Sequence, residues 1–259
     1  MEPLNTILGA DEGSPVAIER PEGRSPVLLV CEHASKVIPR SLGDLRLPAE
    51  LLSSHIAWDP GALDLALFLS RELDARLIHQ RFSRLAYDCN RPPESDSAIP
   101  KRSEIFDIPG NISAAAEEKQ ARVDSIYRPF QAAVAQDVAR RKVAGQLTVL
   151  VTLHSFTPVF KGVRRDVEIG ILHDSDARFA DRVIAALDIG SGFVVRRNDP
   201  YGPADGVTHT LVEHGVSNGL QNVMVEVRND LFADEASRRR VEEHLLRAIV
   251  DSISSEDAA

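Results

Sequence analysis

Cysteines, aromatic residues and long apolar runs are all scarce in this sequence. Its 259 residues include two cysteines, Cys31 and Cys89, which are too few for a disulfide framework or for a zinc site built from cysteine alone. No run is long and apolar enough to cross a membrane. Residues 1–15 carry acidic side chains and lack the basic start and the apolar stretch of a secretory signal. We therefore expect a cytoplasmic protein that has no membrane partner.

An excess of positive charge is lacking as well. The chain has 30 Lys and Arg against 39 Asp and Glu, a formal net charge of −9, which argues against a nucleic-acid partner. The patterns GxGxxG and GxxxxGKS/T, which hold nucleotide phosphates, do not occur. An anionic ligand would therefore have to be met by positive charge gathered at one place.

Short apolar segments of strand type alternate with helical patterns along the chain. The strand-like segments are 26–31, 76–80, 147–153, 167–172, 193–196 and 221–227, and the helical patterns lie at about 61–74, 114–143, 175–188 and 232–255. This alternation predicts a three-layer α/β/α fold whose central sheet is mostly parallel, with helices on both faces. Length alone leaves one large domain or two small ones open. Because no Gly/Ser linker interrupts the pattern, we predict a single domain over residues 1–259.

Several of the strand-like segments end in histidine or glutamate, namely Glu32, His33, His154, His173 and Glu226. Buried charge is costly unless it is paired or bound to a metal, so these side chains need partners. Open α/β sheets bind ligands beyond the carboxyl ends of their strands, and we expect the five side chains to meet at that edge. Neutral imidazole with carboxylate is the usual zinc set, whereas a lone histidine at a strand end is more typical of a surface position. The combination therefore predicts a metal site.

A second polar group lies in the stretch SRLAYDCNRPP, residues 83–93. It places Arg84, Asp88, Asn90 and Arg91 close together. Arginine suits two-pronged recognition of a carboxylate, and asparagine can donate an amide hydrogen bond beside it. The alternative is that Asp88 pairs with one of the arginines and only ties the loop down. The residues that follow, 92–113, are rich in proline, serine and charge, which predicts a long surface excursion acting as a lid or substrate loop.

Five stretches together resemble the N-formylglutamate amidohydrolase family, in a branch of predicted members. They are LLVCEHAS, HIAWDPGALDLA, SRLAYDCNRPP, TLHSFTP and NVMVEVRNDL, and they spread from residue 28 to residue 231. That family is similar in turn to the zinc carboxypeptidases and aspartoacylases. The resemblance implies a fold like that of the zinc exopeptidases and phosphorylase-hydrolases. It also implies hydrolysis of a linear amide in N-formylglutamate or in another small, anionic N-acyl amino acid.

The resemblance also implies a ligand set for Zn²⁺ or another divalent ion. His33 and His154 match two ligands of the wider group. The third ligand of that group is the glutamate of His-x-x-Glu, but Lys36 stands at this position here. Asp59 and Glu32 are the candidates to replace it, in that order, and Asp59 is alternatively a helix cap.

Further roles are implied for the residues that match the catalytic and substrate-binding positions. Glu226 corresponds to the base, Arg84 to the arginine that polarises the scissile carbonyl, and Asn90 with Arg91 to the pair that grips the substrate carboxylate. Alternation along the strand places Arg228 on the side of Glu226, where it orients the base or forms a structural ion pair. Tyr201 and His209 are candidates for substrate contact from a loop.

Three hypotheses follow from these residues. The first is an amidohydrolase acting on an N-formyl amino acid, and the second is a hydrolase of a different N-acyl amino acid or of a peptide terminus. The third is a non-catalytic protein that binds a small anion on the same scaffold, which the departure at Lys36 favours. Nothing in the sequence indicates an oligomeric state.

Overall fold

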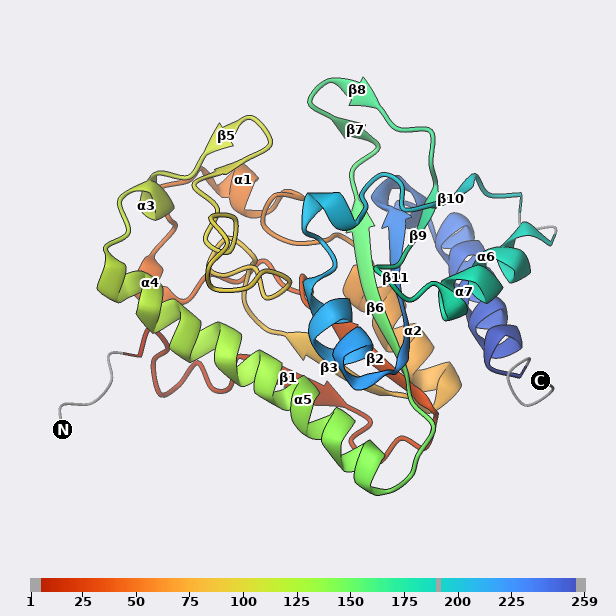
Figure 1. The fold of residues 1–259 in the computed structure, drawn as a ribbon. Coiled ribbons are helices and arrows are strands. Elements are labelled where there is room, and N and C mark those ends of the chain that lie inside the picture. The colour runs from red at the N-terminus through yellow and green to blue at the C-terminus, as the bar shows by residue number, and fades with distance from the viewer. Residues whose placement is uncertain (1–5, 190–191, 255–259) are drawn as a thin grey trace.

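A seven-stranded sheet forms the centre of the protein (Figure 1). The computed structural model describes residues 6–189 and 192–254, and within them the strand order is β1-β3-β2-β6-β11-β9-β10. The strands are β1 (Val16–Glu19), β2 (Val27–Cys31), β3 (Arg76–Gln80), β6 (Val149–Phe156), β9 (Ile169–Leu172), β10 (Val195–Arg197) and β11 (Gln221–Arg228). All but the edge strand β1 were predicted from the sequence.

The sheet is mixed but mostly parallel in its central part. Strands β3, β2, β6 and β11 run in one direction, β1 is antiparallel to β3, and β9 is antiparallel to β11. Because β2, β6 and β11 are parallel neighbours, their carboxyl ends lie at the same edge. The reversed direction of β9 places Leu172 opposite Met224, so His173 lies beside the middle of β11. The expectation that His173 joins the other strand-end residues is therefore wrong.

Two layers of helices cover the sheet, which confirms the α/β/α prediction. On one face α2 (Ala62–Leu73), α6 (Arg178–Asp188) and α7 (Glu235–Ser254) pack on alternate strand residues such as Leu29 and Val151. On the other face α4 (Ala116–Arg122), the π-helical η2 (Val123–Tyr127) and α5 (Arg128–Val143) pack on residues such as Leu28 and Leu150, with the π-helical η4 (Leu211–Gly215) beside them. Every second strand residue thus serves a different core, as strands buried on both faces require. No helix in the described ranges is long and apolar enough to cross a membrane.

Short elements cover the carboxyl edge of the sheet. These are α1 (Ala49–Leu52), α3 (Pro109–Ile112), the hairpin of β4 (Arg102–Ser103) with β5 (Phe106–Asp107) and the hairpin of β7 (Val159–Phe160) with β8 (Val163–Arg164). In Figure 1 both hairpins lie at the top of the view, where the arrows of β6 and β11 point. The remaining turns of 3-10 helix are η1 (Arg40–Leu42), η3 (Pro203–Asp205), η5 (Val216–Asn218) and η6 (Asn229–Phe232).

The segment 92–113 is anchored to the body of the protein. Asn111 is fully buried, and its Nδ2 donates hydrogen bonds of 2.9 Å to the carbonyls of Leu85 and Pro100. Its Oδ1 accepts a 2.7 Å hydrogen bond from the buried guanidinium of Arg122. A third small apolar cluster, which includes Ile56, Leu85 and Ile108, lies beneath. The segment is therefore a folded cover over the carboxyl edge and not a purely surface loop.

Candidate metal centre

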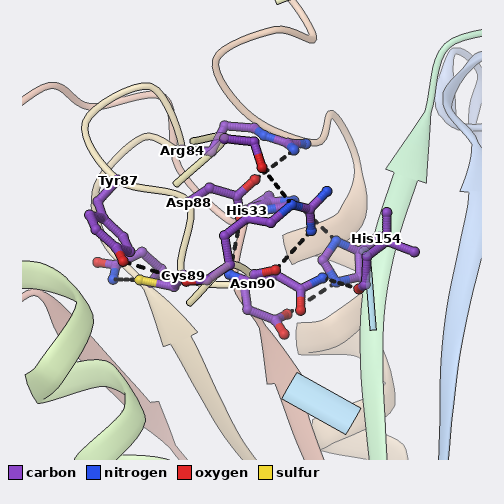
Figure 2. Close-up of polar contacts among 12 residues, drawn as sticks. His33, Arg84, Tyr87, Asp88, Cys89, Asn90 and His154 are labelled. Atoms are coloured by element: carbon purple, nitrogen blue, oxygen red, sulfur yellow. Dashed lines mark hydrogen bonds and ion pairs between the residues drawn. The ribbon is translucent and has the colours of Figure 1, made fainter. Parts of the chain in front are cut away.

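Three ligand atoms from separate parts of the chain converge at the carboxyl edge of β2 and β6, where Figure 2 shows the side chains of His33 and His154. The Nδ1 atoms of His33 and His154 are 3.1 Å apart. Oδ2 of Asp59 lies 3.2 Å from Nδ1 of His33 and 3.0 Å from Nδ1 of His154. All three side chains are buried. They are the one group of metal-ligand type found in the described part of the chain.

Local structure explains why these atoms meet. His33 follows β2, His154 lies within β6, and the two strands are parallel neighbours with Val30 opposite Thr152. Asp59 is held to this edge because its N–H donates a 3.0 Å hydrogen bond to the carbonyl of His33. Its Oδ2 also accepts a 3.2 Å hydrogen bond from the N–H of Ser155.

The turn after Asp59 shows that this residue is not a helix cap. Helix α2 begins at Ala62 with Gly61 as the N-cap residue, and no side chain caps it. Gly61 has a left-handed φ of 82°, and a Cβ atom there would lie 2.2 Å from the ring of Phe232. Only glycine fits this turn without strain. The helix-cap alternative for Asp59 is therefore wrong, and its carboxylate faces the two histidines.

A carboxylate stands behind each histidine ring. Oδ1 of Asp88 lies 2.7 Å from Nε2 of His33, and Oε2 of Glu32 lies 3.1 Å from Nε2 of His154. Of the two candidates for the third ligand, Asp59 thus reaches the shared point, whereas Glu32 contacts the far nitrogen of a ring. The sequence placed Glu32 and Asp88 near the site but did not reveal which atoms they contact.

Arg84 joins two of these carboxylates at the wall of the site. Its Nη1 lies 3.3 Å from Oδ1 of Asp59, and its Nη2 lies 2.8 Å from Oδ2 of Asp88. Figure 2 shows Arg84 and Asp88 together beside His33. Asp88 therefore forms the ion pair considered from the sequence, and it also contacts a candidate metal ligand.

Glu226 lies on β11 directly opposite His154 on β6. Its side chain is buried, and within the described ranges its Oε2 has no hydrogen-bond partner. Burial raises the pKa of Glu226 to about 7, against the pull of His154 and with a further contribution from the charge of Asp59. A carboxyl group with a pKa near neutrality, next to a group of potential metal ligands, has the properties of a general base.

The pKa of His154 is governed by neighbouring carboxylates. Burial opposes the charged form of His154, but the carboxylates of Glu32 and Asp59 outweigh burial and raise its pKa well above the usual value. A carboxylate on each side of the ring therefore favours positive charge at His154.

A cavity of about 270 Å³ opens onto this group. Arg84, Arg91 and Arg102 bring positive charge to its wall, and Tyr201 and Glu226 also line it. Residues within 97–104 and 155–160 supply further parts of the wall. The cavity has the size and charge to hold a small anionic molecule next to the three ligand atoms.

The remaining predicted substrate-binding residues take different positions. Asn90 lines the cavity, but its Nδ2 donates to the carbonyl of Val207 and its Oδ1 accepts a 3.0 Å hydrogen bond from the N–H of Thr210. Its amide is therefore occupied by backbone groups about 120 residues away in sequence. No local pattern in the sequence reports such a contact.

Arg228 and His209 lie outside the wall of the cavity. Arg228 pairs with Glu168 and Asp230 and donates to the carbonyls of residues 165–167, so it takes the structural alternative of the two considered for it. Nε2 of His209 lies 2.9 Å from the hydroxyl of Tyr127.

Sequence reasoning missed a contact at the mouth of the cavity. Oε1 of Glu104, in the turn between β4 and β5, accepts a 2.8 Å hydrogen bond from the N–H of Lys161 in the turn between β7 and β8. Oε2 of Glu104 lies 3.0 Å from Nε2 of His55. These contacts join the two hairpins, and nothing in the local sequence predicts them.

The fold and the site define a class: an α/β protein with a mixed, mostly parallel sheet and a buried His–Asp–His group at the carboxyl edge of its central strands. The sequence profile of the N-formylglutamate amidohydrolase family matches residues 25–233, and the chain belongs to this family. Membership supports an enzyme that hydrolyses amides.

Solved structures share the fold of this chain. A gene product of Agrobacterium tumefaciens is 51% identical over 97% of this chain and 99% of its own, with a TM-score of 0.94. An N-formylglutamate amidohydrolase from Ralstonia eutropha is 19% identical over 95% of this chain and 100% of its own, with a TM-score of 0.67, which shows a shared fold. No curated protein matches the sequence significantly.

Proposed function

We propose that the protein hydrolyses the amide bond of a small N-formyl or similar N-acyl amino acid, assisted by a divalent ion held by His33, Asp59 and His154. The observation that carries this proposal is the convergence of three buried ligand atoms within 3.0–3.2 Å of one another beside Glu226, whose Oε2 has no hydrogen-bond partner among the described residues. Family membership supports the reaction type.

The ligand atoms suit a divalent ion such as Zn²⁺. Two imidazole nitrogens and one carboxylate oxygen form a usual catalytic zinc set, which leaves a position open. The far nitrogen of each ring lies at a carboxylate, so the ring proton can stay there and leave the Nδ1 lone pair available. Such an ion, when bound, supplies Lewis acidity and lowers the pKa of a bound water toward ~7.

Glu226 acts as the proton carrier in this proposal. Its carboxylate takes a proton from the attacking water and later delivers one to the departing amine. Its raised pKa suits both steps, because a group that titrates near the working pH can accept and return a proton.

The arginines of the cavity orient the substrate. Arg84 lies between Asp59 and Asp88 at the wall, where its charge stabilises the negative charge that develops on the amide oxygen. Arg91 and Arg102 line the cavity and bring positive charge for the substrate carboxylate, and Asn90 connects this wall to residues 207–210 through its amide. An acidic protein thus gathers positive charge where an anionic substrate needs it.

The non-catalytic alternative loses its main support. Lys36, the departure that favoured it, is exposed and its Nζ lies 5.5 Å from the centre of the Trp58 ring. It leaves the ligand group undisturbed, and Asp59 supplies the carboxylate from another part of the chain.

A hydrolysis assay tests the proposal. Protein purified without chelators and supplied with Zn²⁺ is incubated with N-formyl-L-glutamate and a panel of other N-formyl and N-acetyl amino acids, and released formate or acetate is measured. We expect metal-dependent turnover of at least one N-formyl amino acid. Absence of turnover across the panel by metal-loaded protein would overturn the proposal.

A further inference from the structure

The two carboxylates behind the histidine rings differ in how their charge is balanced. Oδ2 of Asp88 pairs with Arg84 at 2.8 Å, and its Oδ1 accepts a 3.0 Å hydrogen bond from the N–H of Asn90 in addition to its contact with His33. Asp88 is therefore a well-compensated carboxylate that would keep its place without any ion.

Among the described residues, Glu32 has fewer charge-balancing partners than Asp88. Its side chain is completely buried, and across the described ranges its one ion-pair partner is His154. Within the part of the chain that the structure describes, neither of its carboxylate oxygens makes a hydrogen bond of normal geometry, and the hydroxyl oxygens of Thr152 and Thr210 likewise lack such partners. A buried carboxylate is costly unless a partner balances its charge, and for Glu32 that partner is His154, which outweighs burial and keeps the pKa of Glu32 below its usual value.

We propose that Glu32 is a positioning residue of the metal site, which holds the Nε2–H of His154 so that the Nδ1 lone pair is aimed at the ion. This inference rests on the metal site of the proposed function. Oε2 of Glu32 lies 3.1 Å from Nε2, so its negative charge favours a proton on that nitrogen and leaves Nδ1 to the ion. The negative charge of Glu32 also makes His154 a stronger donor to a cation on the other side of the ring.

The local architecture explains why this position is available. Glu32 comes directly after β2, and His154 lies on the neighbouring parallel strand β6. The carboxylate contacts the ring at Nε2, and Glu32 is not among the residues that line the cavity. Among the described residues, Asp59 and the two imidazoles form the group that would hold the ion, and Glu32 would act on it through His154.

The test is the zinc affinity of matched variants, measured by competition with a chromophoric chelator. Glu32→Gln keeps the shape of the side chain and removes its charge, and we expect zinc to bind about 10- to 100-fold more weakly. We also expect the visible absorption of the Co²⁺-loaded variant to differ from that of wild type, because the geometry of His154 changes.

Two control variants separate the contact between Glu32 and His154 from the loss of a nearby charge and from a general loss of stability. Glu226→Gln removes a buried carboxylate on the strand next to His154 whose Oε2 has no hydrogen-bond partner among the described residues, and it should keep zinc affinity within about threefold of wild type. Asp137→Asn removes a buried, ion-paired carboxylate on α5, whose partner Arg141 contacts Ser25 before the start of β2. It should lower stability and leave the zinc affinity of the folded protein unchanged.

The outcomes are distinct. Zinc affinity of Glu32→Gln within about threefold of wild type, or an equal loss in Glu226→Gln, would overturn the role of Glu32. Absence of zinc binding by wild type would overturn it together with the metal site. A Glu32-dependent zinc site in a protein that hydrolyses no member of the panel would leave this inference standing and remove the proposed reaction.

A measurement on wild type covers the case in which Glu32→Gln does not fold. Nitrogen-15 NMR of the zinc-loaded protein reports which ring nitrogen of His154 carries the proton. We expect the proton on Nε2 with slow exchange against solvent. A proton on Nδ1 would contradict the proposal.

Discussion

Glu226 is the residue whose surroundings fit least with a structural role. It is buried opposite His154, and among the residues described one of its carboxylate oxygens has no hydrogen-bond partner. The substitution Glu226→Gln keeps the shape of the side chain and removes the proton acceptor. We expect the variant to retain its metal and to lose turnover by a factor on the order of 10²–10⁴. Metal content and kcat are measured on the same sample, and unaltered hydrolysis would remove Glu226 from its role.

The same residue makes the stability of the metal-free protein depend on pH. Burial raises the pKa of Glu226 from its usual 4.5 to about 7 in the folded protein. The folded chain therefore binds this proton more tightly than the unfolded chain does. This contribution to stability is complete below pH 4.5 and is lost as the pH rises through 7.

Glu226→Gln removes this dependence. Without metal, we expect the variant to exceed wild type in free energy of unfolding by roughly 2–3 kcal/mol at pH 8, and by little or nothing near pH 4.5. Urea unfolding of both proteins in the presence of a chelator, at several pH values, checks this. A difference that does not change with pH would contradict the raised pKa.

Single residues also show which positions in the site can be predicted from the sequence and which cannot. The rule that ligands gather beyond the carboxyl ends of strands correctly brings His33, His154 and Glu226 together. It fails for His173, because the direction of β9 depends on which strand it pairs with and not on its own residues. The contact of Asn90 with residues 207–210 is hidden for a similar reason, since it joins segments far apart in sequence.

Among the elements, the two hairpins above the cavity depend on Glu104. Its carboxylate bridges the N–H of Lys161 and the ring of His55 and is 12% exposed. Glu104 and Lys161 both have left-handed φ angles, 54° and 49°. Such angles are unfavourable for residues other than glycine and persist where surrounding contacts hold them. The bridge therefore orders the walls that carry Arg102 and Phe160.

Glu104→Ala removes the bridge. We expect the amide hydrogen of Lys161 to exchange faster and KM to rise about fivefold, as the loss of roughly 1 kcal/mol of hydrogen bonding implies, with metal content unchanged. Hydrogen exchange and steady-state kinetics measure these effects. Glu104→Gln is the matched control, because its amide can still accept from Lys161 and contact His55. Identical behaviour of the alanine variant and wild type would show that the hairpins do not need the bridge.

Elements with a clear hydrophobic pattern follow the sequence closely. Helices α2, α6 and α7 and the core strands begin and end within a few residues of their predicted positions. The predicted helix over 114–143 contains the π-helical η2, and the strand predicted at 147–153 continues to Phe156. This extension arises because β6 pairs with β11 as far as Arg228 opposite Phe156. Pairing between distant segments therefore decided that His154 lies within a strand and not beyond it.

At the scale of the whole molecule, a bound ion would join three parts of the fold. Its ligands come from the end of β2, the turn before α2 and the strand β6. An ion that binds only the folded state stabilises it by about 2.7 kcal/mol when present at 100 times its dissociation constant. For a protein of this size we expect chelation to lower Tm by roughly 5–10 °C.

Thermal unfolding with and without a chelator measures this shift. His154→Ala is the control, because it lacks a ligand and its Tm should not respond to chelation. An equal Tm for wild-type protein with and without the chelator would show that no ion contributes to the fold.

The most direct test of the account is the number of divalent ions per chain, determined by elemental analysis of protein purified without chelators. For wild type we predict about one ion per chain, as a single three-ligand site requires. For His33→Ala, His154→Ala and Asp59→Ala we predict a strongly reduced content in protein that remains folded. Wild-type protein without metal, or an undiminished content in all three variants, would contradict the claim that these side chains form the metal site.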